Sequence, residues 1–566
     1  MSGSRWLFVT AAKGLQGYVL RSDPLKEMVG GSELIEQLTR TQEPGFLGKV
    51  LRQLWPGWPR PETDEVLTDS SGAARILFAD REDACRLARV WPLLAGQYAP
   101  GLEVSVAVVE APVDALAKAL KDAEREINVN RNLPTADLPA AGPWVARNRR
   151  TGLPAGSLVT PLDTEDREAK KWEPVDDESR RKREAATATA PSTLLRKVVL
   201  KEYADLVPDD PKARNKRWPP DLTKLATDDN SYIAVIHADA NGLGAAMMAC
   251  LEHLPKGSVA AATYRQVCTA IEDASVAAAQ EALRPLLEAA KRNPKLIVPV
   301  RPLVCAGEDF TCVIRARHAV EFAATYLDTM EKKTSELFAR LPDEVRGSED
   351  LRFLTGCAGV VFCKSHFPFS RAYALAESLC GYAKRRTERK ASAIAFLRLK
   401  SSLQPSDDYE AVVRHAFTAG PATDRISLTM NPYVVGGQPG ADLPRLADLR
   451  ELKKALEGKS RREDARVLKE KAVPRSGVRG LVSRAYSGRA AVDKAFERFE
   501  RVVRERDKAA WEGVEAALQT LTGNKLWKEN READAKDPKA ATPIYDALEL
   551  SHLGKDRDDE DGHADD

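Results

Sequence analysis

Three acidic residues in the middle of the chain have the types and spacing of a divalent-metal site. Asp239 closes one apolar run, while Glu308 and Asp309 stand between two later apolar runs, residues 296–305 and 310–314. Two apolar runs separated by so few residues predict a hairpin with the acidic pair at its tip. If the strand ending in Asp239 lies beside this hairpin, about 4.8 Å away, the three carboxylates converge at one end of a sheet.

Phosphoryl transfer between nucleotides uses two divalent ions about 4 Å apart, and Mg2+ prefers hard oxygen ligands. An acidic residue in a turn is common and by itself indicates only a turn former. Three like charges at one sheet end, however, repel one another unless cations bind, so the combination favours a metal site. The predicted metal ligands are the carboxylates of Asp239, Glu308 and Asp309 and the backbone carbonyl of Ala240; the three carboxylates are also the predicted catalytic residues.

A glycine-containing turn and a basic helix end supply groups that could bind a triphosphate. Backbone N–H groups before a helix attract phosphate, and glycine lets the ligand approach closely. The predicted nucleotide-binding residues are Ala240, Asn241, Gly242, Leu243, Gly244, Gly307 and Lys384. For Arg385 and Arg386, a solvated helix end that complements the helix dipole is an equally good interpretation. His237 shares a strand face with Asp239, and a core histidine is the favoured interpretation there.

The elements that must position these residues form two α+β units. Residues 231–403 read as strand, helix, hairpin, helix, strand, helix and a last strand. Residues 1–141 read in a similar order, provided that a further strand lies before Ala74. The predicted fold is therefore α+β, with two ferredoxin-like palm domains followed by an α-helical C-terminal domain.

Three further segments complete the predicted organisation. Residues 142–230 are rich in Pro, Asp, Glu, Lys and Arg and predict a charged linker or insert with one or two helices. Residues 404–550 carry periodic, highly charged segments and predict a helical domain. Residues 551–566 form an acidic tail that cannot bury a core, and we expect it to be disordered.

Bulk composition excludes several classes of protein. The 566 residues include 86 basic and 84 acidic side chains, so the whole molecule is not a polycation that binds nucleic acid by charge alone. Eight scattered cysteines contain no CxxC pair, which speaks against a zinc knuckle or a disulfide framework. Neither a signal-peptide core nor an apolar run of about 18 residues is present, so we expect a cytoplasmic protein without a membrane partner.

Several motifs, taken in order, resemble a known family. HADANGLG (237–244), PLVCAGEDF (302–310) and CAGVVFCKSHFPFSRAYALAESLCGYAKRR (357–386) resemble the second palm domain of the large polymerase-cyclase subunit of type III CRISPR effector complexes. The opening segment KGLQGYVLRSDPLKEMVGGSELIEQL (13–38) and TPIYDALEL (542–550) resemble the same subunits. The similarity thus spans nearly the whole chain.

The resemblance implies synthesis of cyclic oligoadenylate-type messengers from ATP, with Mg2+ or Mn2+, in prokaryotic antiviral defence. It matches Asp239 to the first metal ligand, Glu308 and Asp309 to the acidic pair of a GGDD hairpin, and Lys384 to a phosphate-binding lysine. The hairpin reads Ala-Gly-Glu-Asp here, and Glu keeps the charge of Asp while extending its reach. The first palm carries no matching carboxylates, and by analogy it binds an acceptor nucleotide or braces the site.

Parts of the family's larger members are not expected here. No His-Asp dipeptide occurs, so we expect no HD nuclease domain, and Asn148-Arg149-Arg150-Thr151-Gly152 stands where a zinc-binding Cys-x-x-Thr-Gly would be.

Two other functions stay open. A catalytically inactive palm scaffold would bind RNA and sibling effector subunits through basic segments such as residues 212–218 and 475–489. Solvated helix and loop faces are the favoured interpretation of both segments. A diguanylate-type cyclase would use GTP instead of ATP, and association of the chain with itself is a further possible partnership.

Overall fold

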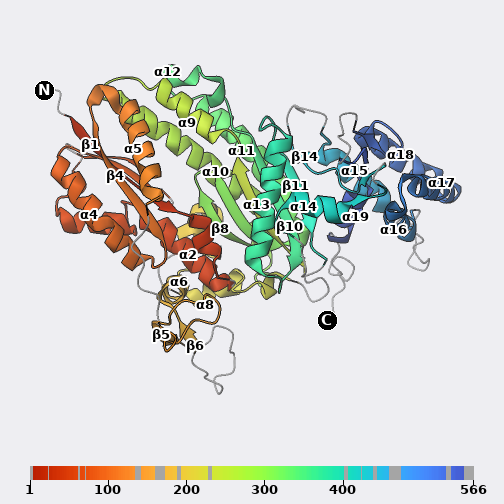
Figure 1. The fold of residues 1–566 in the computed structure, drawn as a ribbon, viewed down its shortest axis with the longest axis horizontal. Coiled ribbons are helices and arrows are strands. Elements are labelled where there is room, and N and C mark those ends of the chain that lie inside the picture. The colour runs from red at the N-terminus through yellow and green to blue at the C-terminus, as the bar shows by residue number, and fades with distance from the viewer. Residues whose placement is uncertain are drawn as a thin grey trace.

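The computed structural model describes most of the chain. The described residues are 4–22, 24–60, 64–70, 72–133, 142–159, 173–187, 193–226, 232–400, 406–421, 424–436, 443–457, 473–530 and 537–553. Two regions of mixed sheet and helix follow one another along the molecule, and a mainly helical region lies at the far end (Figure 1). The fold is mixed α+β, as the sequence predicts. Of the predicted acidic tail, residues 551–553 belong to the last described helix, α19 (Ile544–Leu553), and residues 554–566 lie outside the described residues.

The N-terminal region is built on a four-stranded antiparallel sheet in the order β2-β3-β1-β4. Its strands are β1 (Arg5–Lys13), β2 (Glu65–Thr68), β3 (Ala73–Phe78) and β4 (Glu103–Ala111). Its helices are α1 (Leu15–Leu20), α2 (Leu25–Leu38), α3 (Phe46–Leu54), α4 (Arg81–Tyr98) and α5 (Leu116–Arg131). Strand β2 lies before Ala74, where the sequence pattern required a further strand. The buried indole of Trp91 on α4 donates to the Thr10 hydroxyl on β1 at 2.9 Å, which fixes this helix on the sheet.

The described parts of the segment after this sheet contain more secondary structure than their composition predicts. It contains β5 (Ser157–Val159), β6 (Glu173–Val175), α6 (Asp177–Thr187), α7 (Thr193–Val198) and α8 (Pro211–Arg217). Helix α6 packs against α2. Lys182 on α6 is only 1% exposed, and its ammonium lies 2.7 Å from the Glu178 carboxylate. A charge-rich composition predicts solvated helices because it cannot reveal that the charges pair with each other in the interior.

The central region is built on a six-stranded sheet in the order β14-β11-β10-β7-β9-β8. Its strands are β7 (Tyr232–Ala240), β8 (Val300–Ala306), β9 (Asp309–Arg315), β10 (Gly356–Lys364), β11 (Ala393–Arg398) and β14 (Tyr433–Val434). Its helices are α9 (Leu243–Glu252), α10 (Val259–Arg292), α11 (Ala319–Phe338), α12 (Asp343–Arg346) and α13 (Phe369–Arg386). Strand β7 lies between β10 and β9, antiparallel to both, so the strand that ends in Asp239 adjoins the hairpin.

Helices α11 and α13 lie on opposite faces of this sheet. Gly356 on β10 faces Leu327 of α11, whereas Gly359, three residues later, faces Ala376 of α13. Because side chains alternate along a strand, β7 residues in register with Cys357 and Gly359 point to the α13 face. His237 and Asp239 are those residues.

The C-terminal region contains short strands that the sequence pattern did not predict. Its helices are α14 (Tyr409–Val412), α15 (Leu446–Glu457), α16 (Arg475–Arg484), α17 (Arg489–Arg506), α18 (Lys508–Thr522) and α19 (Ile544–Leu553). A small sheet, β12-β13-β16-β15, joins Thr418–Ala419, Ile426–Ser427, Ala540–Ala541 and Lys528–Glu529. Strands of two residues are too short for an alternating pattern to register, so the expectation of helices alone missed them.

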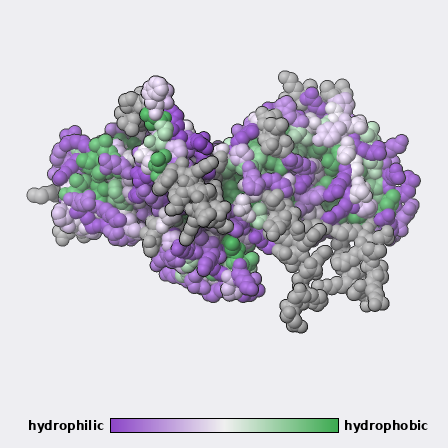
Figure 2. Space-filling model, turned by 90° about the horizontal axis from the view of Figure 1, so that it is seen from below, coloured by the Kyte–Doolittle hydropathy of each residue, from purple (hydrophilic) through white to green (hydrophobic). Residues whose placement is uncertain are grey.

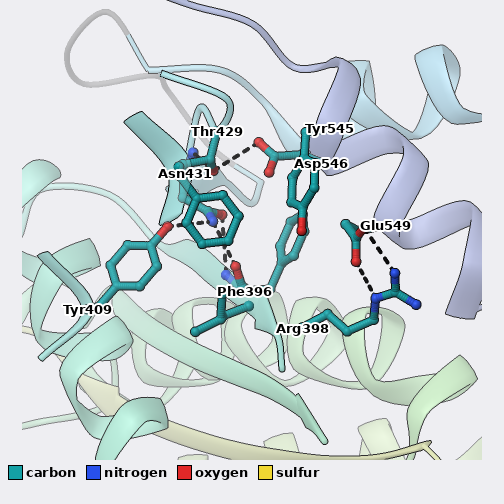
Figure 3. Close-up of a pocket in the computed structure, with 10 residues that line it drawn as sticks. Phe396, Arg398, Tyr409, Thr429, Asn431, Tyr545, Asp546 and Glu549 are labelled. Carbon is teal, nitrogen blue, oxygen red and sulfur yellow. Dashed lines mark hydrogen bonds and ion pairs between the residues drawn. The ribbon is translucent and has the colours of Figure 1, made fainter. Parts of the chain in front are cut away.

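Helix α19 is fastened to the edge of the central sheet by buried polar groups (Figure 3). The Asp546 carboxylate accepts hydrogen bonds from the Tyr433 hydroxyl at 2.6 Å and from the Met430 backbone N–H at 2.8 Å. Glu549 pairs with the guanidinium of Arg398 from β11. The cavity between these groups measures about 10 Å³. Since that volume holds no more than one water molecule, these residues join the C-terminal region to the sheet and form no ligand pocket.

Polar and charged side chains cover most of the face shown in Figure 2, with hydrophobic areas between them. Within the part of the chain that the structure describes, no helix has the length and apolarity needed to cross a bilayer.

The contact between β10 and α13 generates a testable prediction. A Cβ added at Gly359 would lie 1.9 Å from the Ala376 carbonyl oxygen, so Gly359→Ala must push α13 away from the sheet. We expect a loss of about 1–3 kcal/mol in the free energy of unfolding, typical of overpacking, measured by thermal or chemical denaturation. Gly381→Ala, on α13 itself, is the matched control because its Cβ would meet only the Arg385 guanidinium, at 3.6 Å. An equal effect of the two substitutions would contradict the prediction.

Candidate metal and nucleotide site

Asp239 and Asp309 face each other across two neighbouring strands. Asp239 is the next-to-last residue of β7, Asp309 is the first residue of β9, and the two are register partners. Side chains of opposed residues in antiparallel strands have Cβ atoms about 4.5–5.5 Å apart. The ladder therefore brings together two carboxylates that are 70 positions apart in the sequence.

Glu308 lies in the turn beside this pair. Ala306 and Asp309 are register partners, so Gly307 and Glu308 are the two central residues of a tight hairpin. Gly307 has φ +58°, the left-handed conformation that the first central position of a type II′ turn requires. Glycine at position 307 thus permits a two-residue turn, which places Glu308 at the end of the ladder that pairs Asp239 with Asp309.

Burial and mutual repulsion perturb the carboxyl groups. Burial, followed by the charges of Asp239 and Glu308, raises the pKa of Asp309 to about 8. Burial and the charge of Asp239 also raise the pKa of Glu308. A buried carboxyl such as Asp309, whose pKa lies near 8, is stabilised in its charged form by cations, which is the electrostatic character of a divalent-metal site.

Lys384 supplies the nearest cation. Its ammonium lies 2.5 Å from Asp239 Oδ2 and donates to the Ala240 carbonyl oxygen at 3.0 Å. Lys384 is 13% exposed, on the last turn of α13. The predicted phosphate-binding lysine is therefore at the site, where it contacts both a predicted carboxylate ligand and the predicted carbonyl ligand.

His237 belongs to the same group of potential ligands. One donor atom each from His237, Asp239 and Asp309 lies within 4.8 Å of the other two. Among the described residues, Glu308 is not part of this closest group. His237 is 4% exposed, and its Nδ1 lies 3.3 Å from the Thr311 hydroxyl. Burial lowers the pKa of the imidazole to about 4, so the ring is neutral at neutral pH.

The turn after β7 has a divided role. The Asn241 amide points inward and donates to the Thr355 hydroxyl at 3.0 Å, so this side chain joins β7 to the start of β10. Gly242, with φ +77°, precedes α9, and Leu243 and Gly244 form the first helical turn. The N–H groups of a first turn have no partner within the helix. These backbone groups, and not the Asn241 side chain, are the ones suited to phosphate.

Three residues at the site were not predicted from the sequence. Gln16 of α1 donates from Nε2 to Asp309 Oδ2 at 3.0 Å. Its Oε1 accepts a hydrogen bond from the Tyr373 hydroxyl of α13. The charge of Glu377, also on α13, raises the pKa of Asp309. Helical spacing of 373, 377 and 384 along one face could have indicated the α13 residues, but nothing local to Gln16 indicates a partner nearly 300 positions away.

One basic segment considered for RNA binding is largely structural. Arg214 and Trp218 are buried, and the Arg217 guanidinium donates to the Ala290 carbonyl oxygen at 2.6 Å near the end of α10. In the other segment, residues 475–489, Arg479 and Arg484 of α16 are exposed.

The first sheet contributes no carboxylate at the positions matching Asp239. Thr10 and Ala11 there are buried, and position 71 lies outside the described residues. The Asn148 segment, where zinc ligands would stand, is held by hydrogen bonds. The Asn148 amide and the Thr151 hydroxyl both donate to Asp176 Oδ2, at 2.6 and 2.8 Å.

No protein-family profile matches the chain, and no curated protein matches it in sequence. Solved structures that contain Csm1 are similar to the chain at low identity. The Csm1–Csm4 cassette with cA4 is 12% identical with a TM-score of 0.46, and the cassette with pppApA is 13% identical with a TM-score of 0.47; each comparison covers 98% of this chain and 70% of the other. Csm1 of T. onnurineus is 12% identical with a TM-score of 0.45, covering 97% of this chain and 69% of that one.

Proposed function

We propose that the chain is a metal-dependent nucleotidyltransferase of the palm type that joins ATP into cyclic oligoadenylate. The observation that supports the proposal is the register pairing of Asp239 with Asp309, with Glu308 in the adjoining turn and Lys384 beside them. In this proposal the two sheets, β2-β3-β1-β4 and β10-β7-β9-β8, are ferredoxin-like palms. The second palm carries the acidic site.

The donor groups fit a divalent cation. Three carboxylates, two of them directly opposed, give the hard oxygen ligands that Mg2+ and Mn2+ take. Burial, and after it the charge of Asp239, raises the pKa of both Asp309 and Glu308, and a bound dication would stabilise their charged forms. Asp239, Glu308 and Asp309 would hold the ions, with the Ala240 carbonyl available when Lys384 turns to another acceptor. Bound there, the ions would supply charge stabilisation for the phosphoryl group and its leaving oxygen.

The protein's own residues would bind and orient the nucleotide. The backbone N–H groups at the start of α9 and the Lys384 ammonium can contact the phosphates of one ATP. The 3′-hydroxyl of a second nucleotide attacks the α-phosphorus, a new P–O bond forms, and the bond to pyrophosphate breaks. The hydroxyl proton leaves to solvent or to a site carboxylate. Holding the hydroxyl and phosphorus in line is the main contribution of such a site.

Adenine as the base and sibling effector subunits as partners are part of the same proposal. Both rest on the motifs that resemble the type III CRISPR large subunit, which are distributed from residue 13 to residue 550.

Removal of the hairpin acids tests the site assignment. We expect Glu308→Ala/Asp309→Ala to lower the conversion of ATP to oligonucleotide and pyrophosphate by roughly a hundredfold or more, because metal charge stabilisation contributes several kcal/mol. Products are identified by mass spectrometry with Mg2+ or Mn2+. The matched control is Asp343→Ala/Glu344→Ala, an adjacent and exposed acidic pair on α12. Equal product from the hairpin variant and the wild type would exclude this site.

The pKa of Asp309 predicts a pH dependence of metal binding. Below about pH 8 the carboxyl must lose a proton before it can ligate, so Mn2+ affinity should rise about tenfold per pH unit up to pH 8 and then level off. In the metal-free protein this group acts on stability. The folded state keeps a proton that the unfolded chain loses near the ordinary aspartate pKa of 3.8, so the free energy of unfolding should decrease between that pH and about 8. Electron paramagnetic resonance of free Mn2+ measures the affinity, and Asp309→Asn should flatten the curve.

Nucleotide choice separates an oligoadenylate synthase from a diguanylate-type cyclase. A ligand at a hundred times its Kd stabilises the folded protein by about 2.7 kcal/mol, so the preferred nucleotide raises Tm. With Mn2+ present, we expect ATP to raise Tm more than GTP at equal concentration. The opposite order would favour the guanylate reaction.

A further inference from the structure

Gln16 connects the first region of the chain to the acidic site in the central region. Its side chain makes two hydrogen bonds there at once, donating to Asp309 Oδ2 at 3.0 Å and accepting from the Tyr373 hydroxyl. Gln16 is half-buried and lies in the first turn of α1, whereas Asp309 and Tyr373 belong to β9 and α13. The amide therefore has a defined orientation: its NH2 group faces the carboxylate and its carbonyl faces the hydroxyl.

Helix α1 is itself held firmly, so Gln16 is not a mobile surface side chain. The Lys182 ammonium of α6 donates to the backbone carbonyl of Tyr18, which lies two residues after Gln16 on α1. The same ammonium lies 4.1 Å from the centre of the Tyr18 ring and 2.7 Å from the Glu178 carboxylate. A buried lysine with an ion pair, a carbonyl and an aromatic ring as partners is ordered. Helix α6 thus holds α1 in place, and α1 positions the Gln16 side chain against Asp309.

A hydrogen bond to one carboxylate oxygen sets the plane of the carboxylate and leaves the second oxygen able to ligate a cation. Hydrogen-bonded partners of this kind orient metal ligands in general. We infer that Gln16 is a positioning residue that holds Asp309 in its ligating orientation, with Tyr373 fixing the Gln16 amide. This inference rests on the proposed metal-dependent function. The central region then reaches full metal affinity only when α1 is docked against it.

A neutral donor suits this position. The charges of Asp239, Glu308 and Glu377 all raise the pKa of Asp309. A cationic partner for Asp309 would remove the negative charge that attracts a dication, whereas an amide orients the carboxylate and leaves its charge in place.

Gln16→Met tests the inference, because methionine has a similar length and makes neither hydrogen bond. Mn2+ binding to the full chain, measured by electron paramagnetic resonance at pH 8.5 without nucleotide, should weaken about tenfold. Gln97→Met, at an exposed position of α4, is the matched control and should bind as the wild type does. Tyr373→Phe is a second test for the case in which Gln16→Met lowers Tm, because it removes only the hydroxyl that donates to the Gln16 amide. It should weaken binding in the same direction and add little to Gln16→Met in the double variant.

The outcomes distinguish this inference from the function on which it rests. Wild-type binding that Asp309→Asn weakens, together with unchanged affinity in Gln16→Met and Tyr373→Phe, would overturn the role of Gln16 and leave the metal site standing. Wild-type protein that binds no Mn2+ would overturn the metal site and the inference together. Loss of affinity in both variants with an unchanged Tm supports positioning, since a purely structural contact would lower Tm.

Discussion

The repulsion between Asp239 and Asp309 is the constraint on which the rest of the site depends. The antiparallel ladder of β7 and β9 places them opposite each other, and the turn adds Glu308. Burial of Asp309, followed by the charges of Asp239 and Glu308, raises the pKa of its carboxyl to about 8. The Lys384 ammonium offsets this repulsion at Asp239, whereas the neutral Gln16 amide donates to Asp309 and leaves its charge in place.

Helix α13 can act on the pair because it lies unusually close to the sheet. Gly359 has no side chain, so the helix backbone at Ala376 approaches β10 directly. The helix then runs over the face of β7 that carries His237 and Asp239. Tyr373 contacts the His237 ring at 5.6 Å between ring centres, and Lys384, eleven residues later, reaches Asp239. One close backbone approach thereby places two side chains of one helix at two positions of one strand.

The sequence predicted those strands that a local run of apolar residues forms on its own. The run before Asp239 and the hairpin around Glu308 have continuous apolar stretches interrupted by glycine and acids, and these became β7, β8 and β9. The burial of α6 was not predicted, because a charge-rich composition indicates a solvated helix. Its charges are buried as pairs, as Lys182 and Glu178 are, and pairing depends on neighbours that composition does not specify. Asn241 was predicted as part of a phosphate-binding turn, and the direction of its amide, which donates to Thr355 in the interior, could not be read from the sequence. Gln16 gave no local signal, since its meaning comes entirely from Asp309 and Tyr373.

The two partners of the acidic pair differ in a way that separates their roles. Lys384 is charged and belongs to the same region as Asp239, so it can offset the repulsion whenever the central sheet is folded. Gln16 is neutral and comes from the other end of the chain, so its contact with Asp309 exists only when the first region and the α6 segment are packed in place. The charge of Lys384, in the same region, therefore offsets the repulsion at the acidic site, whereas the hydrogen bond that orients Asp309 comes from Gln16, far away in the sequence.

A displacement of α1 relative to the central sheet would change the geometry of Asp309 without unfolding the sheet that carries it, because the ladder of β7 and β9 does not involve α1. The packing between the two regions thus determines whether Gln16 reaches Asp309.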